Sequence, residues 1–285
     1  MIHIEHRLLS PEEAAATCDY LKSAADQAAN IGVRVQSLFG RCCLESAGLT
    51  NSLAEMSKEA AHLADGILAD RNPGQLDLDP LLLIGSYQML SHAGVIVKPM
   101  YRVLEQIATA LQLQPAATRG AGRVRHMSSQ LAELGFAIRP GNPSSEMARL
   151  LGSPAAWFGA SVPDLAELAH HLIANRRSLD EMSGRALSLL ALAELRNYRI
   201  DLGCTLLQAV LQLGELCAES SEALNFIALQ RRRDGRYGFP SQFAGATEQG
   251  SVPDSALYLP LTVNAVWLFS TAANCRSQFQ PTAIG

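Results

Sequence analysis

The stretch ALNFIALQRRRDGRYGF, residues 223–239, decides the fold expected for this chain. It begins as an apolar helix that ends near Gln230. Asp234 and Gly235 then predict a tight turn, because glycine readily adopts the positive φ that such turns need. A glutamine at a helix end can cap backbone groups that lack intrahelical partners, and an aromatic ring such as Tyr237 can cover the capped end. The stretch therefore predicts a clamp between helices, the alternative being a direct contact of Gln230 and Tyr237 with a substrate.

The order of these residues, Phe226-x3-Gln230-x4-Gly235-x-Tyr237, resembles the QW motif of the α/α-toroid superfamily. Squalene and oxidosqualene cyclases carry this motif, and protein prenyltransferases and complement-type thioester domains carry looser versions. Tyr237 stands where the motif has tryptophan. The resemblance implies a terpenoid cyclase/prenyltransferase-like fold more strongly than it implies an activity.

The rest of the chain also predicts helices. Hydrophobic residues make up 48% of the sequence and aromatic residues only 6%, a balance typical of packed helices. Helix starts follow the S-x-x-E capping pattern at Ser10, Ser52 and Ser178. We expect an all-α chain, for which the resemblance to the QW motif implies an α/α toroid of helical hairpins, with an open α-solenoid as the alternative.

The expected domain organisation is simple. Residues 1–275 are predicted to form a single α/α domain, in which the helices of residues 1–114 form a possible subdomain. The small and turn-forming residues 115–121 are the best candidate linker. Residues 276–285 are expected to be a flexible tail.

Charge and cysteine usage exclude several classes of protein. A net charge of −4 gives no general attraction to nucleic acid or to an anionic membrane, and the sequence lacks an apolar run long enough to cross a bilayer. The six cysteines show no CxxC pair, and several lie on apolar helix faces, where a reduced thiol behaves as a small hydrophobic group. These features indicate a cytoplasmic protein.

A narrow polar stripe is the strongest functional pattern. Residues 201–219 are predicted to form one helix, apolar almost all round, whose polar residues recur at steps of three and four. We expect Gln208, Gln212 and Glu215 at the centre of this stripe to line an internal cavity and Asp201 to lie at the helix entry, the alternative being a solvent-facing edge. These glutamines and Asp201 are candidate substrate-binding residues.

Acid–base chemistry has three candidates. Glu215 and Glu194 are carboxyl groups on otherwise apolar helices, where desolvation raises a carboxyl pKa, and Tyr258 is a possible phenolic donor. Arg236, from the basic run that begins at Arg231, and Trp267 complete the candidate substrate-binding set. The basic run is either solvated or a site for an anion.

No metal or cofactor is expected. The nearest approach to the D-x-D-D motif of class II terpene cyclases is Asp77-Leu78-Asp79-Pro80, which lacks the last acid, and Asp79 fits an N-cap before proline. The magnesium-binding D-D-x-x-D cluster and the zinc signatures of lanthionine cyclases are also missing.

Two functions follow from these observations. The first is a tailoring enzyme of specialised-metabolite biosynthesis, cofactor-independent and cyclase- or lyase-like, that cyclises or isomerises an apolar or peptide-like substrate in the toroid cavity. The second is a non-catalytic helical protein that binds a peptide or carrier partner.

Overall fold

The protein is helical throughout the part that the structure describes. The computed structural model describes residues 9–70, 78–175, 179–214, 216–238 and 254–279, and outside the helices these ranges hold only an isolated antiparallel bridge between Arg231 and Tyr237. The predicted all-α class is confirmed.

The helices, in chain order, are α1 (Pro11–Gln27), α2 (Ile31–Ser46), α3 (Leu53–Ala69), α4 (Pro80–His92), α5 (Lys98–Leu113), α6 (Ala116–Arg119), α7 (Gly122–Glu133), α8 (Ser145–Gly152), the 3-10 helix η2 (Pro154–Gly159), α9 (Val162–Asn175), α10 (Glu181–Arg196), α11 (Ile200–Gln212), α12 (Ala218–Ala228) and α14 (Asp254–Phe279). The short helix α6 falls inside the predicted linker, and α14 continues past residue 276, where the tail was expected to begin.

The chain divides into two compact units, each built from separate segments of sequence. The first, here called the α2 unit, contains residues 7–106 and 227–267. The second, the α9 unit, contains residues 107–226 and 268–285 together with the first six residues.

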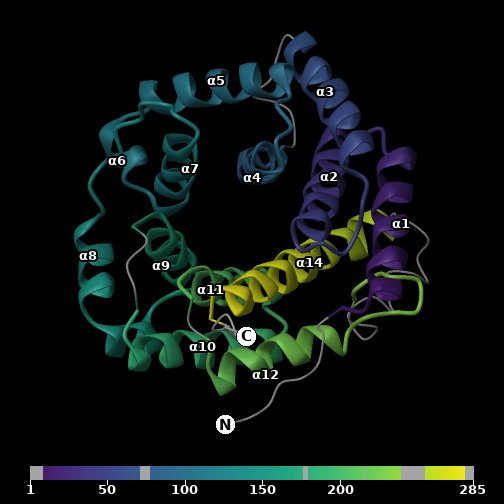
Figure 1. The fold of residues 1–285 in the computed structure, drawn as a ribbon. Coiled ribbons are helices and arrows are strands. Elements are labelled where there is room, and N and C mark those ends of the chain that lie inside the picture. The colour runs from purple at the N-terminus through teal and green to yellow at the C-terminus, as the bar shows by residue number, and fades with distance from the viewer. Residues whose placement is uncertain (1–8, 71–77, 176–178, 215, 239–253, 280–285) are drawn as a thin grey trace, which may run out of the picture. The chain divides into compact units, whose positions relative to one another are not determined.

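In the α2 unit, α2 is the central helix. It packs against α1, α3 and α4 (Figure 1). Ten of its 16 residues are buried, against five of 17 in α3, so α2 is enclosed on most sides while α3 buries one face. The ring of Phe39 on α2 meets the ring of Trp267 on α14 edge-on, with centroids 5.2 Å apart. The Phe39 ring also packs against Gly85 of α4, where it fills the space that a side chain would need.

The α9 unit is also built from packed helices. Helix α9 packs against α7 and α11, and α10 pairs with α11 (Figure 1). Nine of the 13 residues of α11 are buried. Gly203 lies against Leu195, where an added Cβ would come within 2.6 Å of the leucine side chain, so glycine permits close approach of α10 and α11. The predicted helical hairpin is therefore present.

The single helix predicted over residues 201–219 is wrong. Helix α11 ends at Gln212, Gly214 adopts a φ of +83°, and α12 begins only at Ala218. Glycine in the left-handed conformation is a common helix terminator. Consequently the polar residues at the two ends of the predicted stripe belong to different helices.

The predicted helix starts had mixed outcomes. Ser10 forms the expected capping box with Glu13, and Asp79 caps α4 through the Leu81 N–H. The box predicted at Ser52 is wrong, because the Ser52 side chain caps nothing. Ser178 lies outside the described residues, and Asp180 caps α10.

No helix among the described residues is long and apolar enough to cross a membrane.

Candidate functional site

The clamp turn, residues 230–238, packs against α1 and α14 in the α2 unit. Gly235 adopts a φ of +83° and lies against the backbone of α1, where an added Cβ would come within 2.4 Å of the Ala16 carbonyl group. Tyr237 is fully buried, and its N–H donates to Thr262 Oγ1 of α14 at 3.0 Å. Burial raises the pKa of the Tyr237 hydroxyl. The turn thus ties α1 to α14, as a structural clamp does.

Arg231, Arg232 and Arg236 of the clamp turn have partners within the protein. Arg231 forms an ion pair with Glu13 of α1, and the Arg236 Nε donates to Asp234 Oδ2 at 2.9 Å. The guanidinium of Arg236 also lies 4.8 Å from the ring centroid of Tyr258, whose hydroxyl accepts from Arg232 at 3.4 Å. The structure therefore brings together two predicted site residues, Arg236 and Tyr258, at this turn.

Two other predicted site residues, Glu194 and Asp201, lie near the connection between α10 and α11. The Glu194 carboxylate is 3.1 Å from Arg199 Nη1, and only 11% of its side chain is exposed. Asp201 is exposed, and its carbonyl group accepts from the Thr205 hydroxyl at 2.7 Å. This ion pair links α10 to the N-cap residue of α11.

The predicted polar stripe is divided between different environments. Gln208 is buried and donates to Thr271 Oγ1 of α14 at 3.0 Å, whereas Gln212 is exposed at the end of α11. Glu215 lies outside the described residues. Trp267 is half-buried against Phe39 in the α2 unit.

A pocket opens elsewhere, between α2, α3 and α4 of the α2 unit, with a cavity volume of about 110 Å³. Its apolar walls are formed by Cys42, Leu53, Met56, Met89, Leu90 and Ala93. Two polar residues near the end of α2, Glu45 and Ser46, complete the lining. The exposed Ser46 and Ala93 mark its opening to solvent, while Cys42 and Met56 lie buried at its base.

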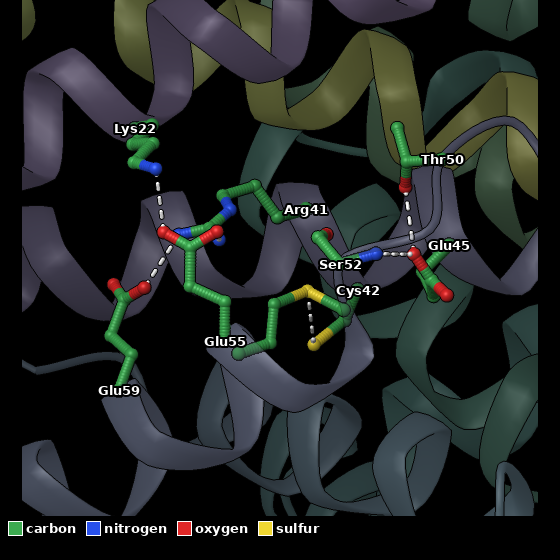
Figure 2. Close-up of polar contacts among 9 residues, drawn as sticks. Lys22, Arg41, Cys42, Glu45, Thr50, Ser52, Glu55 and Glu59 are labelled. Carbon is green, nitrogen blue, oxygen red and sulfur yellow. Dashed lines mark hydrogen bonds and ion pairs between the residues drawn. The ribbon is translucent and has the colours of Figure 1, made fainter.

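Glu45 is held in place at the rim by the loop that leads into α3. Its Oε2 accepts from the Thr50 hydroxyl at 2.9 Å and from the Ser52 N–H at 2.9 Å. Figure 2 shows the second carboxylate oxygen directed away from these two donors. Glu45 thus takes the place that Glu55 was predicted to fill in the capping box, and it lines the pocket as well.

Two helices end at the same rim. After α2, Gly48 adopts a φ of +68° and the Leu49 N–H donates back to the Leu44 carbonyl at 3.0 Å. After α4, Gly94 adopts a φ of +81° and the Val95 N–H donates to Leu90 at 2.9 Å. Both are Schellman ends. Since a helix C-terminus carries partial negative charge, both ends add to the negative potential of Glu45.

A charge network anchors α2 beside the pocket (Figure 2). Arg41 is 1% exposed, and its guanidinium pairs with Glu59 at 2.5 Å and with Glu55 at 3.5 Å, both on α3. Lys22 of α1 reaches Glu55 at 2.7 Å. The network links three helices through a buried charge, so it fixes the position of the last turns of α2, from which Cys42 and Glu45 project.

Cys42 carries a buried thiol. Burial raises the pKa of its thiol to about 12, so the reactive thiolate is almost absent at neutral pH. Its Sγ faces Met56 Sδ at 3.9 Å. Among the described residues, no group of three His, Cys, Asp or Glu side chains is arranged to hold a metal ion.

A buried histidine cluster lies in the α9 unit. The Nδ1 atoms of His126 and His170 are 3.1 Å apart, and Gln130 lies 3.2 Å from the other ring nitrogen of His126. Burial, and to a lesser degree His170, lowers the pKa of His126 to about 3. Burial also lowers the pKa of His171 to about 4. The rings of His126 and His171 are therefore neutral and buried at physiological pH.

Comparison of the chain with protein-family models, with curated proteins and with solved structures finds no match.

Sequence reasoning missed the pocket. Two local signals were present: the glycines Gly48 and Gly94 that end α2 and α4, and methionines on two neighbouring helices. Neither signal shows that the two helix ends meet beside α3, because that depends on packing between segments about 45 residues apart.

Proposed function

We propose that this chain is a non-catalytic helical protein that binds a peptide partner, with one aliphatic side chain of the peptide in the pocket and a neighbouring basic residue at Glu45. The observation that carries the proposal is the pocket itself, which combines apolar walls with a fixed carboxylate at its mouth. Sites for small ligands and side chains commonly have this composition.

The size and lining of the pocket suit a single side chain. A cavity of about 110 Å³ accommodates a group such as the isobutyl of leucine, and burying such a side chain contributes about 1.5–3 kcal/mol. Met56 and Met89 add adaptability, because methionine is unbranched and polarizable and can repack around different apolar shapes. We therefore expect a preference for leucine, isoleucine or methionine over aromatic residues.

The carboxylate of Glu45 at the pocket rim is the second determinant of peptide binding. Glu45 is half-buried and held by Thr50 and Ser52, so little side-chain entropy is lost when it pairs with a cation. The C-terminal ends of α2 and α4 add partial negative charge. A lysine or arginine beside the inserted residue is the complementary partner, and an acidic residue there is disfavoured.

The enzyme hypothesis has less support from the geometry. Neither Glu194 nor Tyr258 is among the residues that line the pocket. Glu194 pairs with Arg199, and the hydroxyl of Tyr258 accepts a hydrogen bond from Arg232. Glu215 remains its candidate acid or base. A tailoring enzyme requires substrate turnover that the Glu215→Gln variant loses.

We also propose that the helices form an α/α toroid. Supporting this are the contrast between the enclosed α2 and the one-sided α3, the α10–α11 hairpin and the buried Tyr237 of the clamp turn. A closed 285-residue domain has a radius of gyration of about 19 Å, and an open solenoid a larger one, which small-angle X-ray scattering distinguishes. The six free cysteines support a reducing, cytoplasmic location.

The binding proposal is tested by selection from a random peptide library. We expect the enriched peptides to share an aliphatic residue beside lysine or arginine. Ala93→Trp blocks the pocket mouth from an exposed position at the end of α4, and Ala193→Trp makes the same change on an exposed position of α10. Loss of binding in Ala93→Trp alone supports the proposal. Equal binding by both variants, or an enriched motif without the aliphatic residue, contradicts it.

A further inference from the structure

Three sulfur-containing residues from three different helices line the pocket. Cys42 of α2 and Met56 of α3 are almost fully buried, at 1% and 0% exposed, and Met89 of α4 lines the same cavity. Cys42 Sγ and Met56 Sδ lie 3.9 Å apart. The pocket opens to solvent beside Ser46 and Ala93, so a small solute has a path to these sulfurs.

The separation of the first two sulfurs fits joint ligation of one metal ion. A zinc ion binds cysteine sulfur at about 2.3 Å, so two sulfur ligands at this distance and about 120° apart lie about 4.0 Å from each other. The observed 3.9 Å requires almost no movement of α2 or α3. Met89 lines the same cavity and is the candidate for a third sulfur ligand.

The donor set selects the metal. Thiolate and thioether sulfur are soft ligands that favour Cu(I), whereas magnesium and calcium require oxygen ligands and structural zinc sites use Cys and His. The charge of the complex also favours Cu(I). A thiolate with Cu⁺ is neutral and can remain in an apolar cavity, whereas a divalent ion with one thiolate leaves a net charge there.

We propose that Cys42, Met56 and Met89 form a binding site for Cu(I). Binding exchanges one proton for the metal: Cys42–SH and Cu⁺ give Cys42–S–Cu and H⁺, which leaves to the solvent without any change of oxidation state. The site does not rest on peptide binding, although the two occupants share one cavity and therefore compete. Because one proton is released, the affinity rises about tenfold for each pH unit in the neutral range.

The test is an anaerobic titration of the whole protein with Cu(I) against a chromogenic Cu(I) chelator. We expect one bound Cu(I) per chain with only sulfur neighbours in copper-edge X-ray absorption. Cys42→Ala should weaken binding at least about 100-fold, and Met56→Leu and Met89→Leu at least about tenfold each, since even loss of an outer-shell partner costs 10–100-fold.

Matched controls use sulfurs away from the pocket. Cys204→Ala removes an equally buried thiol, and Met127→Leu a buried thioether of the α9 unit. Both should bind copper as the parent does. Circular dichroism checks that each variant folds, and Met→Leu changes conserve volume.

The proposal is overturned if no copper remains on the protein in competition with the chelator, or if binding survives Cys42→Ala and is lost on replacing the partly exposed Cys18 or Cys217. Its failure is distinguishable from failure of the peptide proposal, because peptide selection is carried out without copper and the leucine variants keep the pocket apolar.

Discussion

The clamp turn and the pocket both belong to the α2 unit, and both place charged residues beside a glycine of positive φ, yet they use these charges differently. At the clamp turn Arg231 pairs with Glu13 and Arg236 with Asp234, and the turn seals a fully buried tyrosine. At the pocket one oxygen of Glu45 is held while the other is directed away from its donors, beside an open cavity. Charges whose partners are internal hold a fold together, whereas a fixed charge at a cavity mouth can recognise a ligand.

The largest effect is expected at the clamp turn. Tyr237→Ala removes a fully buried aromatic side chain and should lower the free energy of unfolding by about 3–5 kcal/mol, measured by urea denaturation. Phe158→Ala, at a position 61% exposed, is the control and should cost less than about 0.5 kcal/mol. If Tyr237→Ala leaves stability unchanged and abolishes ligand binding, the clamp turn is the site and the comparison is inverted.

The pH dependence of stability gives a second comparison between regions, because the buried histidines lie in the α9 unit and not at the pocket or the clamp turn. The pKa of His126 is about 3 in the folded protein, and a histidine in an unfolded chain titrates near 6.5. Below pH 6.5 this histidine binds a proton in the unfolded chain but not in the folded protein. The free energy of unfolding is therefore highest above pH 6.5 and falls as the pH drops towards 3.

Between pH 7 and pH 5 this single group should lower the free energy of unfolding by about 2 kcal/mol. His126→Gln should lose that part of the pH dependence, and His62→Gln, at an exposed position of α3, should keep it. The measurement is urea denaturation of the three proteins at both pH values. The same pH dependence in His126→Gln as in the parent would refute the assignment.

The smallest effect is expected at Glu45. Glu45→Gln keeps an oxygen that accepts from Thr50 and Ser52, so stability should fall by no more than about 1 kcal/mol. Binding of a basic peptide should weaken about three- to fivefold and lose most of its salt dependence, as expected for one partly exposed ion pair. Binding that is unchanged, or tighter at high salt, would remove Glu45 from the site.

Local signals in the sequence predicted much of the fold. The Ser10 capping box, the Asp79 cap, the turn at Gly235 and the α10–α11 hairpin each depend on residues close together in the chain, and all are present. Gly214 was an equally local signal for the end of α11, and the regular spacing of polar residues concealed it.

The candidate site was not predictable in this way. Ser52 and Glu55 carry a capping-box pattern, but Glu45, on the preceding helix, accepts from the Ser52 N–H, and Glu55 pairs with Lys22 and Arg41 instead. This exchange requires α2 and α3 to be packed. The failure of a strong local rule next to an open cavity is the pattern expected near a functional site.

Methyl NMR of protein labelled with ¹³C at the methionine methyl groups tests the central claim most directly. The probe is the capped dipeptide acetyl-Leu-Lys-amide, with acetyl-Leu-Glu-amide as its charge-reversed control. We predict that the lysine peptide shifts the resonances of Met56 and Met89 and leaves Met127 and Met147 of the α9 unit unchanged, and that the glutamate peptide does so only at higher concentration. Unchanged resonances of Met56 and Met89, with shifts at Met127 or Met147, would contradict the account.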